Sequence, residues 1–448
     1  MEEYVEHTVG RILSRDPGRV LEIGCGTGLI MFPLVPHCES YTGTDLSAVA
    51  IDQLKGLQQD PDLRSRITGL EQITLLQRPA HDLSGFPSGC FDSVILPSVV
   101  QYFPGVQYVS QLLESLIPTL AEGGSIFLGD VRSLGLLEPF HASVQRYKAE
   151  ADVPTKELLT RMRQRIESEQ EMAIDPAFFL ALKQQHDRVS DVEILPKRGR
   201  AQNEMTRYRY DVVIRLDRPA PVIANVEWDD WEAQPISADG IAVHLQSQEP
   251  ALLALQNISN ARVEQDLRAL RLLRSHRTCP DKASLMAQLS KQDSTGIEPE
   301  DLWMIGRNLP YRVCLSMARS GEEGTFDALF VRTEQDAAPS YSMPEPEKIR
   351  PDVYCANNPL QERLARRIIP RFREFLRGKV PVYMVPSDFT LLSRMPVTPA
   401  GKIDRDALPE PDVSSAIGTE GDNPPHTTDQ RRLSHIWSEV LDIDLNDV

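Results

Sequence analysis

The residues best suited to chemistry lie near the start of the 448-residue chain, in Val20-Leu21-Glu22-Ile23-Gly24-Cys25-Gly26-Thr27-Gly28. Three glycines at alternate positions follow an apolar run, and glycines there let the backbone approach a ligand with no Cβ in the way. Asp45 comes 17 residues after Gly28, and a carboxylate at that place can hold both hydroxyls of a ribose. The spacing predicts a nucleoside-binding strand–loop–helix unit at the carboxyl edge of a parallel sheet.

Two nucleotide-binding patterns compete for this loop. A dinucleotide fingerprint has the spacing G-x-G-x-x-G, with a pyrophosphate at a helix N-terminus. This chain instead has Gly24-x-Gly26-x-Gly28, preceded by Glu22. The pattern E-x-G-x-G-x-G resembles the first motif of class I S-adenosylmethionine-dependent methyltransferases. A structural turn without chemistry is the plain alternative.

The methyltransferase resemblance implies S-adenosyl-L-methionine as the cofactor. In that family the glycine loop contacts the methionine moiety, the second acid contacts the ribose, and a further acid stands at the adenine edge. Cys25 receives no chemistry of its own, because any small residue would serve at its place. The expected cofactor contacts are Glu22, Gly24, Cys25, Gly26, Gly28, Asp45, Leu46, Ala80, His81, Asp82, Ser98 and Gln101.

The elements that must position these residues predict a doubly wound α/β sheet. Segment 91–96 is apolar and β-branched, as buried strands are, and it leads into a loop at the ligand-binding edge of such sheets. Segment 123–132 reads as a turn, a strand and another loop on that edge. Five strand–helix units in about 130 residues predict a Rossmann-like class I methyltransferase fold. Residues 1–15 predict a helix that precedes this sheet.

Later segments predict further elements. Residues 203–214 alternate in character as a strand does, and 326–331 also reads as a strand. Apolar residues recur at helical spacing in three other segments, which are 264–273, 282–289 and the basic stretch 360–376.

A second signature lies near the carboxyl end, in 381–386 and in Pro396-Val397-Thr398-Pro399-Ala400-Gly401-Lys402-Ile403-Asp404-Arg405. It closely resembles the end of the adenylation domain of non-ribosomal peptide synthetases, where a lysine on a tight turn reaches carboxylate and phosphate oxygens. The resemblance gives Lys402 that catalytic role, because a cation there stabilises developing charge. That family usually has Asn where this chain has Ala400. Since no ATP loop or amino-acid pocket is found, we expect this adenylation part to be incomplete and inactive alone.

Together the two signatures resemble an N-methyltransferase domain embedded in an adenylation domain. The segments that match this type are 98–103, 129–133, 140–142, 203–204 and 208–210, whereas Pro97 stands where the type usually has Asn. The resemblance implies methylation of the α-amine of an aminoacyl thioester on a phosphopantetheine-bearing carrier domain, with the rest of the synthetase as partner. Candidates for orienting that amine are Gln101, Tyr102, Arg132, His141, Glu204 and Tyr208.

The expected organisation follows from these matches. It comprises a methyltransferase core over 1–220, an accessory region over 221–335, a linker over 336–350, a small α+β adenylation subdomain over 351–410, a linker over 411–427 and the first helix of a truncated carrier domain over 428–448.

Composition argues against other classes of protein. The net charge is −17 with no basic stripe, so nucleic acid and anionic membranes are poor partners. No apolar run approaches a membrane span and the N-terminus lacks signal-peptide features, which predicts a cytoplasmic protein. Six cysteines at no metal spacing and nine scattered histidines predict no metal site.

Two alternatives stay open at this point. A non-catalytic scaffold fragment of a synthetase is favoured by Pro97 and Ala400 and opposed by the intact glycine loop with Asp45. Methylation at carbon or oxygen of a tethered intermediate is the other. The amino-acid substrate is not named by the sequence.

Overall fold

The computed structural model of the chain describes residues 1–219, 226–275, 279–291, 295–319, 324–333 and 355–386, with single positions between and after these ranges. It divides into two compact units, Met1–Pro359 and Leu360–Val448. The predicted linker at 411–427 and the carrier helix at 428–448 lie outside the described residues, as does most of 336–350. In the second unit the described elements are α14 (Gln361–Arg377) and the 3-10 helix η6 (Val382–Met384).

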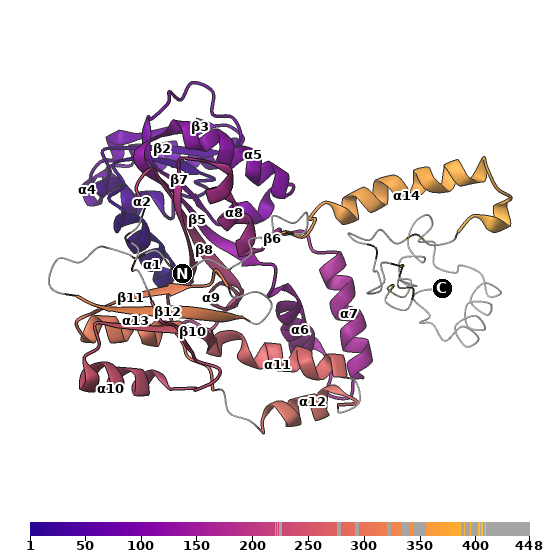
Figure 1. Cartoon of the computed structure of the whole chain (residues 1–448). Helices are drawn as coiled ribbons and strands as arrows, with labels where there is room; N and C mark the ends of the chain where they lie inside the picture. Colours follow the sequence, from indigo (N-terminus) through magenta and orange to yellow (C-terminus); the bar gives the residue numbers. More distant parts are fainter. Residues whose placement is uncertain are drawn as a thin grey trace. The chain divides into compact units, whose positions relative to one another are not determined.

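The main sheet of the first unit has the strand order β3-β2-β1-β4-β5-β8-β7, and the two-residue β6 also pairs with β5 (Figure 1). Its strands are β1 (Arg19–Ile23), β2 (Ser40–Asp45), β3 (Ile73–Gln77), β4 (Phe91–Pro97), β5 (Leu120–Ser133), β6 (Ala173–Ile174), β7 (Val189–Pro196) and β8 (Arg209–Leu216). Strand β8 runs antiparallel to both of its neighbours, β5 and β7. Strands β1 to β5 pair in parallel, so the predicted doubly wound α/β sheet is confirmed.

Alternating apolar residues bury both faces of the sheet. Val20 and Phe127 pack into one core, together with apolar residues of α1, α2 and α3. Leu21 and Ile126 point to the other face, where α5 and α8 supply the partners. Burying each such side chain contributes about 1.5–3 kcal/mol. The helices and 3-10 turns around this sheet are α1 (Glu2–Leu13), α2 (Met31–Leu34), η1 (Val35–His37), α3 (Ala48–Gln59), α4 (Pro61–Arg66), η2 (Leu70–Gln72), η3 (Val100–Tyr102), α5 (Val106–Leu116), η4 (Ile117–Thr119) and α8 (Pro176–Gln185).

The parallel register brings four strand ends to one edge, here called the rim. Ile23 pairs with Thr44 of β2, and Pro97 pairs with Gly129 of β5. The residues that follow these positions in the chain therefore lie together, as ligand-binding residues do in open α/β sheets.

Two further layers complete the first unit. Helices α6 (Leu137–Lys148), α7 (Thr155–Glu167), α11 (Ala261–Ser275) and α12 (Lys282–Leu289) share a core of their own. A second sheet of β9 (Asp229–Asp230), β10 (Leu252–Ser259), β11 (Tyr311–Ser316) and β12 (Thr325–Arg332) has the order β11-β12-β10-β9. Helices α10 (Ala238–Gln248) and α13 (Pro299–Asn308) lie beside it in Figure 1. The N–H of Met317, just after β11, donates to the Ile194 carbonyl of β7 at 2.8 Å.

The helices predicted at 1–15, 264–273, 282–289 and 360–376 and the strand at 326–331 are confirmed. The strand predicted over 203–214 is wrong in its first half, where the chain forms α9 (Glu204–Tyr208) before β8 begins. Asn203 explains the difference, because its side chain accepts the Thr206 N–H at 3.1 Å while the Thr206 hydroxyl accepts the Asn203 N–H at 3.3 Å. This capping box starts a helix. None of the helices described here is long and apolar enough to cross a membrane.

Candidate functional site

The glycine loop between β1 and α2 has a backbone that only glycine adopts easily. Gly24, Gly26 and Gly28 have φ angles of 78°, 51° and 78°. A Cβ at Gly24 would lie 2.8 Å from Val99 Cγ2 and one at Gly28 would lie 2.7 Å from Phe32 Cε2. At Gly26 a Cβ would meet its nearest heavy atom only at 4.0 Å. The first and third glycines are therefore needed for packing, and the second leaves open space for a ligand against the backbone.

Asp45 is bound to this loop by its carboxylate. One carboxylate oxygen accepts the Gly26 N–H at 2.9 Å and the other accepts the Ser47 N–H at 2.8 Å. Each oxygen has two lone pairs, so both retain capacity to accept from a ribose hydroxyl. Leu46 follows with 72% of its surface exposed, which gives the rim an apolar side chain beside the acid.

Glu22 and Cys25 lie beneath the loop. The Glu22 carboxylate is buried and accepts the Tyr41 hydroxyl at 2.8 Å, which joins β1 to β2. Burial raises the pKa of Glu22 to about 7, against the opposing effect of the Tyr41 hydrogen bond. Burial also raises the pKa of the Cys25 thiol. Both side chains therefore support the loop from the interior.

The loop after β4 carries two polar residues at the rim. Ser98 has a φ of 53°, and its hydroxyl donates to the Asp130 carboxylate. Gln101 is 2% exposed and its Nε2 donates to the Ser98 carbonyl at 3.0 Å. Among the described residues, Gln101 Oε1 has no hydrogen-bond partner. A buried acceptor without a donor costs about 1–3 kcal/mol, so this atom is suited to meet a ligand's donor.

At the expected adenine edge, the side chains bond to their own surroundings. His81 Nδ1 lies 3.0 Å from the Tyr108 hydroxyl, and Ala80 is half-buried next to it. The Asp82 carboxylate accepts the Ser84 hydroxyl at 2.6 Å and the Ser84 N–H at 3.1 Å. These bonds lower the pKa of Asp82. The turn at 79–84 is thus held in a defined shape beside the rim.

Six charged or titratable side chains near the end of β5 form what we call the rim ion cluster, consisting of Arg132, His141, Glu169, Glu171, Glu204 and Arg209. His141 Nε2 lies 3.0 Å from Glu169 Oε2, and Arg132 lies 3.1 Å from the other Glu169 oxygen. Arg132 also lies 3.3 Å from Glu171. Arg209 pairs with Glu204 at 2.7 Å and reaches Glu171 at 3.8 Å. The cluster brings together the predicted residues Arg132, His141 and Glu204, through ion pairs of the two arginines and the contact between His141 and Glu169.

The buried end of this cluster is strongly charged. Burial acts to raise the pKa of Glu169, but hydrogen bonds from His141 and the Glu171 N–H, with the charge of Arg132, lower it to about 2. At the outer end the side chains of Glu171 and Glu204 are 31% and 40% exposed. The outer carboxylates can therefore accept hydrogen bonds from a substrate.

The cluster is attached to the rim loop by the backbone. The Gln101 carbonyl accepts the Met172 N–H at 2.8 Å, directly after Glu171. The same loop contains Val99, which packs over Gly24. The segment from Val99 to Gln101 thus contacts both the glycine loop and the part of the chain that supplies the cluster's glutamates.

Three other predicted residues lie apart from the cluster. Tyr102 is mostly exposed on η3. Tyr208 is buried, and its hydroxyl lies 2.8 Å from Asp266 of α11 and 3.0 Å from Ser143. Burial and the Asp266 charge raise the pKa of Tyr208. Lys402 is exposed in the second unit, where most neighbouring positions lie outside the described residues.

Sequence reasoning missed Glu169, Glu171 and Arg209. The two glutamates lie in the segment between α7 and β6 that carries no motif, and Arg209 begins β8. Contacts with Arg132 and His141 place the two glutamates in the site, and ion pairs with Glu171 and Glu204 place Arg209 there.

Comparison with known proteins adds to this geometry. Residues 21–128 match the methyltransferase domain family. Chondramide synthase cmdD of Chondromyces crocatus is 36% identical over 451 residues, covering 99% of this chain and 11% of that protein. Peramine synthetase A of Epichloe festucae is 30% identical over 473 residues, covering 100% of this chain and 17% of that protein. The nonribosomal peptide synthetase agiA of Aspergillus flavus is 30% identical over 431 residues, covering 91% of this chain and 5% of that protein. The chain therefore spans only a small part of the length of each of these relatives.

Proposed function

We propose that this chain, which contains a class I S-adenosyl-L-methionine-dependent methyltransferase domain, methylates the α-amine of an aminoacyl thioester during non-ribosomal peptide synthesis. The aminoacyl group would be held on the phosphopantetheine arm of a carrier domain, with the remainder of a synthetase as partner. Similarity to synthetases over almost the whole chain supports this assignment.

The observation that carries the proposal is the hydrogen bond between the Gln101 carbonyl and the Met172 N–H. It joins the loop that packs over Gly24 to the segment that supplies Glu169 and Glu171. The loop that we assign to the cofactor and a group of acceptor carboxylates are thereby joined through one short segment, which supports a transfer between two bound molecules.

The cofactor supplies a methyl group already activated on a sulfonium sulfur. The residues around it have binding roles. The open space at Gly26 would take the amino-acid tail, the Asp45 carboxylate would accept from the ribose hydroxyls, and the exposed Leu46 would cover an apolar surface of the cofactor. The buried Gln101 Oε1 has no partner among the described residues and would accept a hydrogen bond from the cofactor. Holding the reactants in line contributes about 7–11 kcal/mol in well-oriented reactions.

The acceptor amine needs to be neutral and correctly directed. The pKa of a free α-amine is about 7.7–8.0, so no strong base is required to make the amine neutral. Glu204 and Glu171 are partly exposed and hold Arg209 between them, which leaves oxygens free to accept an amine N–H. His141 and Glu169 lie behind them, and their pairing keeps Arg132 in position. We assign the outer carboxylates to orientation and the inner pair to support.

The test uses two acceptors that differ only at nitrogen. An aminoacyl-pantetheine thioester with a free amine is compared with the same thioester carrying an N-acetyl group, each with isotopically labelled cofactor. Label uptake by the free amine alone supports the proposal. Equal uptake by both would favour carbon or oxygen methylation, and cofactor binding without uptake by any acceptor would favour a scaffold role.

Lys402 keeps its predicted role only as part of a larger protein. If a complete adenylation domain is assembled around this chain, Lys402→Ala is expected to abolish amino-acid adenylation and to leave methyl transfer to a supplied aminoacyl-pantetheine thioester intact. Exchange of pyrophosphate into ATP would measure the first activity, and equal loss of both activities would contradict the separation.

A further inference from the structure

A buried lysine that carries no sequence motif lies where β7 ends. Lys197 is 4% exposed, and its Nζ lies 2.8 Å from Asp130 Oδ1 and 2.8 Å from Asp211 Oδ1. Arg11 of α1 pairs with the other oxygen of Asp211. Two buried carboxylates thus depend on two buried cations, and removing one partner of such a group is strongly destabilising.

Asp130 transmits the position of Lys197 to the rim. Asp130 is fully buried with a φ of 62°, and its carboxylate accepts the hydroxyl of Ser98, whose φ is 53°. A non-glycine residue in the left-handed region costs about 1–3 kcal/mol and persists only where its surroundings enforce it. Here two such residues, Ser98 directly after β4 and Asp130 within the adjacent strand β5, are bonded to each other. They hold the loop whose next residue, Val99, packs over Gly24.

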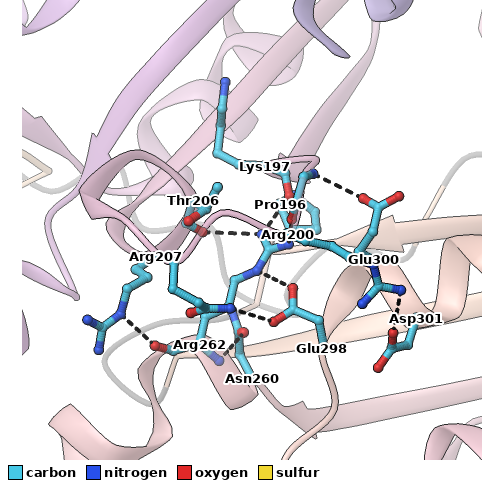
Figure 2. A network of polar contacts seen from close by, with 12 residues as sticks. Pro196, Lys197, Arg200, Thr206, Arg207, Asn260, Arg262, Glu298, Glu300 and Asp301 are labelled. Carbon is cyan, nitrogen blue, oxygen red and sulfur yellow. Dashed lines mark hydrogen bonds and ion pairs between the residues drawn. The ribbon is translucent and has the colours of Figure 1, made fainter. Parts of the chain in front are cut away.

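Arg262 of α11 contacts the backbone of Lys197, and Figure 2 shows the Lys197 side chain pointing away from it. Arg262 is 3% exposed and its Nη1 donates to the Lys197 carbonyl at 2.6 Å and to the Thr206 carbonyl at 3.2 Å. Its Nη2 donates to the Gly199 carbonyl at 2.6 Å, and its Nε pairs with Glu298. One guanidinium therefore closes the loop 197–206 that follows β7.

These contacts form a continuous polar path from Arg262 through Lys197 and Asp130 to Ser98. We propose that Arg262 and Lys197 are positioning residues for the cofactor, so that a residue of α11 sets the affinity of a site built from β1, β2 and β4. This inference rests on the proposed function only in that the chain binds S-adenosyl-L-methionine. It does not depend on which molecule accepts the methyl group. It predicts that cofactor affinity falls when α11 releases the loop 197–206.

The first test compares two substitutions at the ends of one ion pair. Arg262→Gln removes the donors to Lys197 and Gly199, whereas Glu298→Gln removes the charge pair and leaves those carbonyl contacts. Calorimetric titration with S-adenosyl-L-homocysteine measures affinity, and a thermal melt measures stability. Both variants should melt earlier. Only Arg262→Gln should bind less tightly, by roughly five- to tenfold, the range of ordinary coupling between sites.

A second pair of variants covers the case in which Arg262→Gln does not fold. Ser98→Gly and Ser98→Ala both remove the hydroxyl, but only glycine adopts a φ of 53° without strain. If the path serves to hold that conformation, Ser98→Ala should bind S-adenosyl-L-homocysteine about fivefold more weakly than Ser98→Gly. Equal affinity of the two variants would overturn the inference.

The outcomes separate this inference from the proposed function. If the unaltered chain binds no S-adenosyl-L-homocysteine, the proposed function fails. If the unaltered chain binds S-adenosyl-L-homocysteine and Arg262→Gln binds it as tightly as Glu298→Gln does, the proposed function stands and the positioning role is wrong.

Discussion

Asp45 accepts the backbone N–H of Gly26 at 2.9 Å, so the acid at the end of β2 is bonded to the centre of the glycine loop. The bond places a carboxylate and an open backbone position side by side at the end of two adjacent strands. A ligand bound at one of these groups would therefore also contact the other, as we propose for the nucleoside and amino-acid tail of the cofactor.

Asp45→Asn tests this relationship. The amide retains one oxygen for Gly26 or Ser47 and turns a donor toward the other N–H, so the loop and the ribose contacts are both weakened. We expect affinity for S-adenosyl-L-homocysteine to fall by roughly 10- to 100-fold, since hydrogen bonds to charged groups contribute about 1.5–3 kcal/mol. Calorimetry measures the change. Asp60→Asn, which alters a similar backbone-bonded acid at the N-cap of α4, is the control, and equal affinities in both variants would contradict the assignment.

Gly24→Ala is expected to abolish cofactor binding. The new Cβ would lie 2.8 Å from Val99 Cγ2 on a backbone with a φ of 78°, so both packing and conformation oppose it. Adding Val99→Ala should restore part of the binding by removing the clash. Gly56→Ala is the matched control, because a Cβ there meets nothing within 4 Å inside α3, and it should stabilise the helix by about 0.5–1 kcal/mol. Undiminished binding by Gly24→Ala would show that the loop does not contact the cofactor.

Glu169 should make the stability of the chain depend on pH in acid. Its pKa is lowered from 4.5 to about 2 in the folded chain, so its contribution is complete above about pH 4.5 and is lost as the pH falls to about 2. Glu169→Gln should lose up to about 3 kcal/mol of stability at neutral pH and match the unaltered chain near pH 2. Urea unfolding across this range gives the difference.

Glu157→Gln, which breaks an exposed pair with Arg161 in α7, is the control for that experiment. The difference in unfolding free energy between Glu157→Gln and the unaltered chain should not change between about pH 4.5 and about pH 2. A difference between Glu169→Gln and the unaltered chain that stays constant from pH 7 to about pH 2 would contradict the charged pairing with His141 and Arg132.

Glu204→Gln tests the orienting role of the outer carboxylates. The amide keeps the shape and loses the charge that pairs with Arg209 and that, in the proposed function, would accept an amine N–H. We expect kcat/KM for the aminoacyl thioester to fall by roughly 10- to 100-fold while affinity for S-adenosyl-L-homocysteine is unchanged, because a lost charged contact costs about 1.5–3 kcal/mol. Glu138→Gln, which alters an exposed pair with Arg274, should leave both values unchanged. Equal loss of cofactor affinity in Glu204→Gln would indicate a structural role.

The sheet core was predictable because its signals are local. Glycines at alternate positions after Val20–Ile23 and an acid at position 45 define the loop, and in the structure the Gly26 N–H donates to the Asp45 carboxylate. The predicted helices at 264–273 and 282–289 have apolar residues at helical spacing, which burial in the core of α11 and α12 explains. Strand β7 was missed although Val189–Pro196 alternates in burial along its length.

The rest depends on contacts between distant parts of the chain. Lys197 and Arg262 lie 65 residues apart, and their meeting follows from the packing of α11 against the loop after β7. Glu169 meets His141 across 28 residues, in a segment with no periodic pattern. Asn203 did carry a local signal, since Asn-x-x-Thr is a capping pattern, but alternation of the next residues outweighed it in the prediction of a strand.

The most direct measurement locates the transferred methyl group. The chain is incubated with S-adenosyl-L-methionine carrying a deuterated methyl and with an aminoacyl-pantetheine thioester, and the product is fragmented in a mass spectrometer. The proposed function predicts that the label lies on the α-nitrogen. Label on carbon or oxygen, or an unlabelled product from a chain that binds the cofactor, would contradict it.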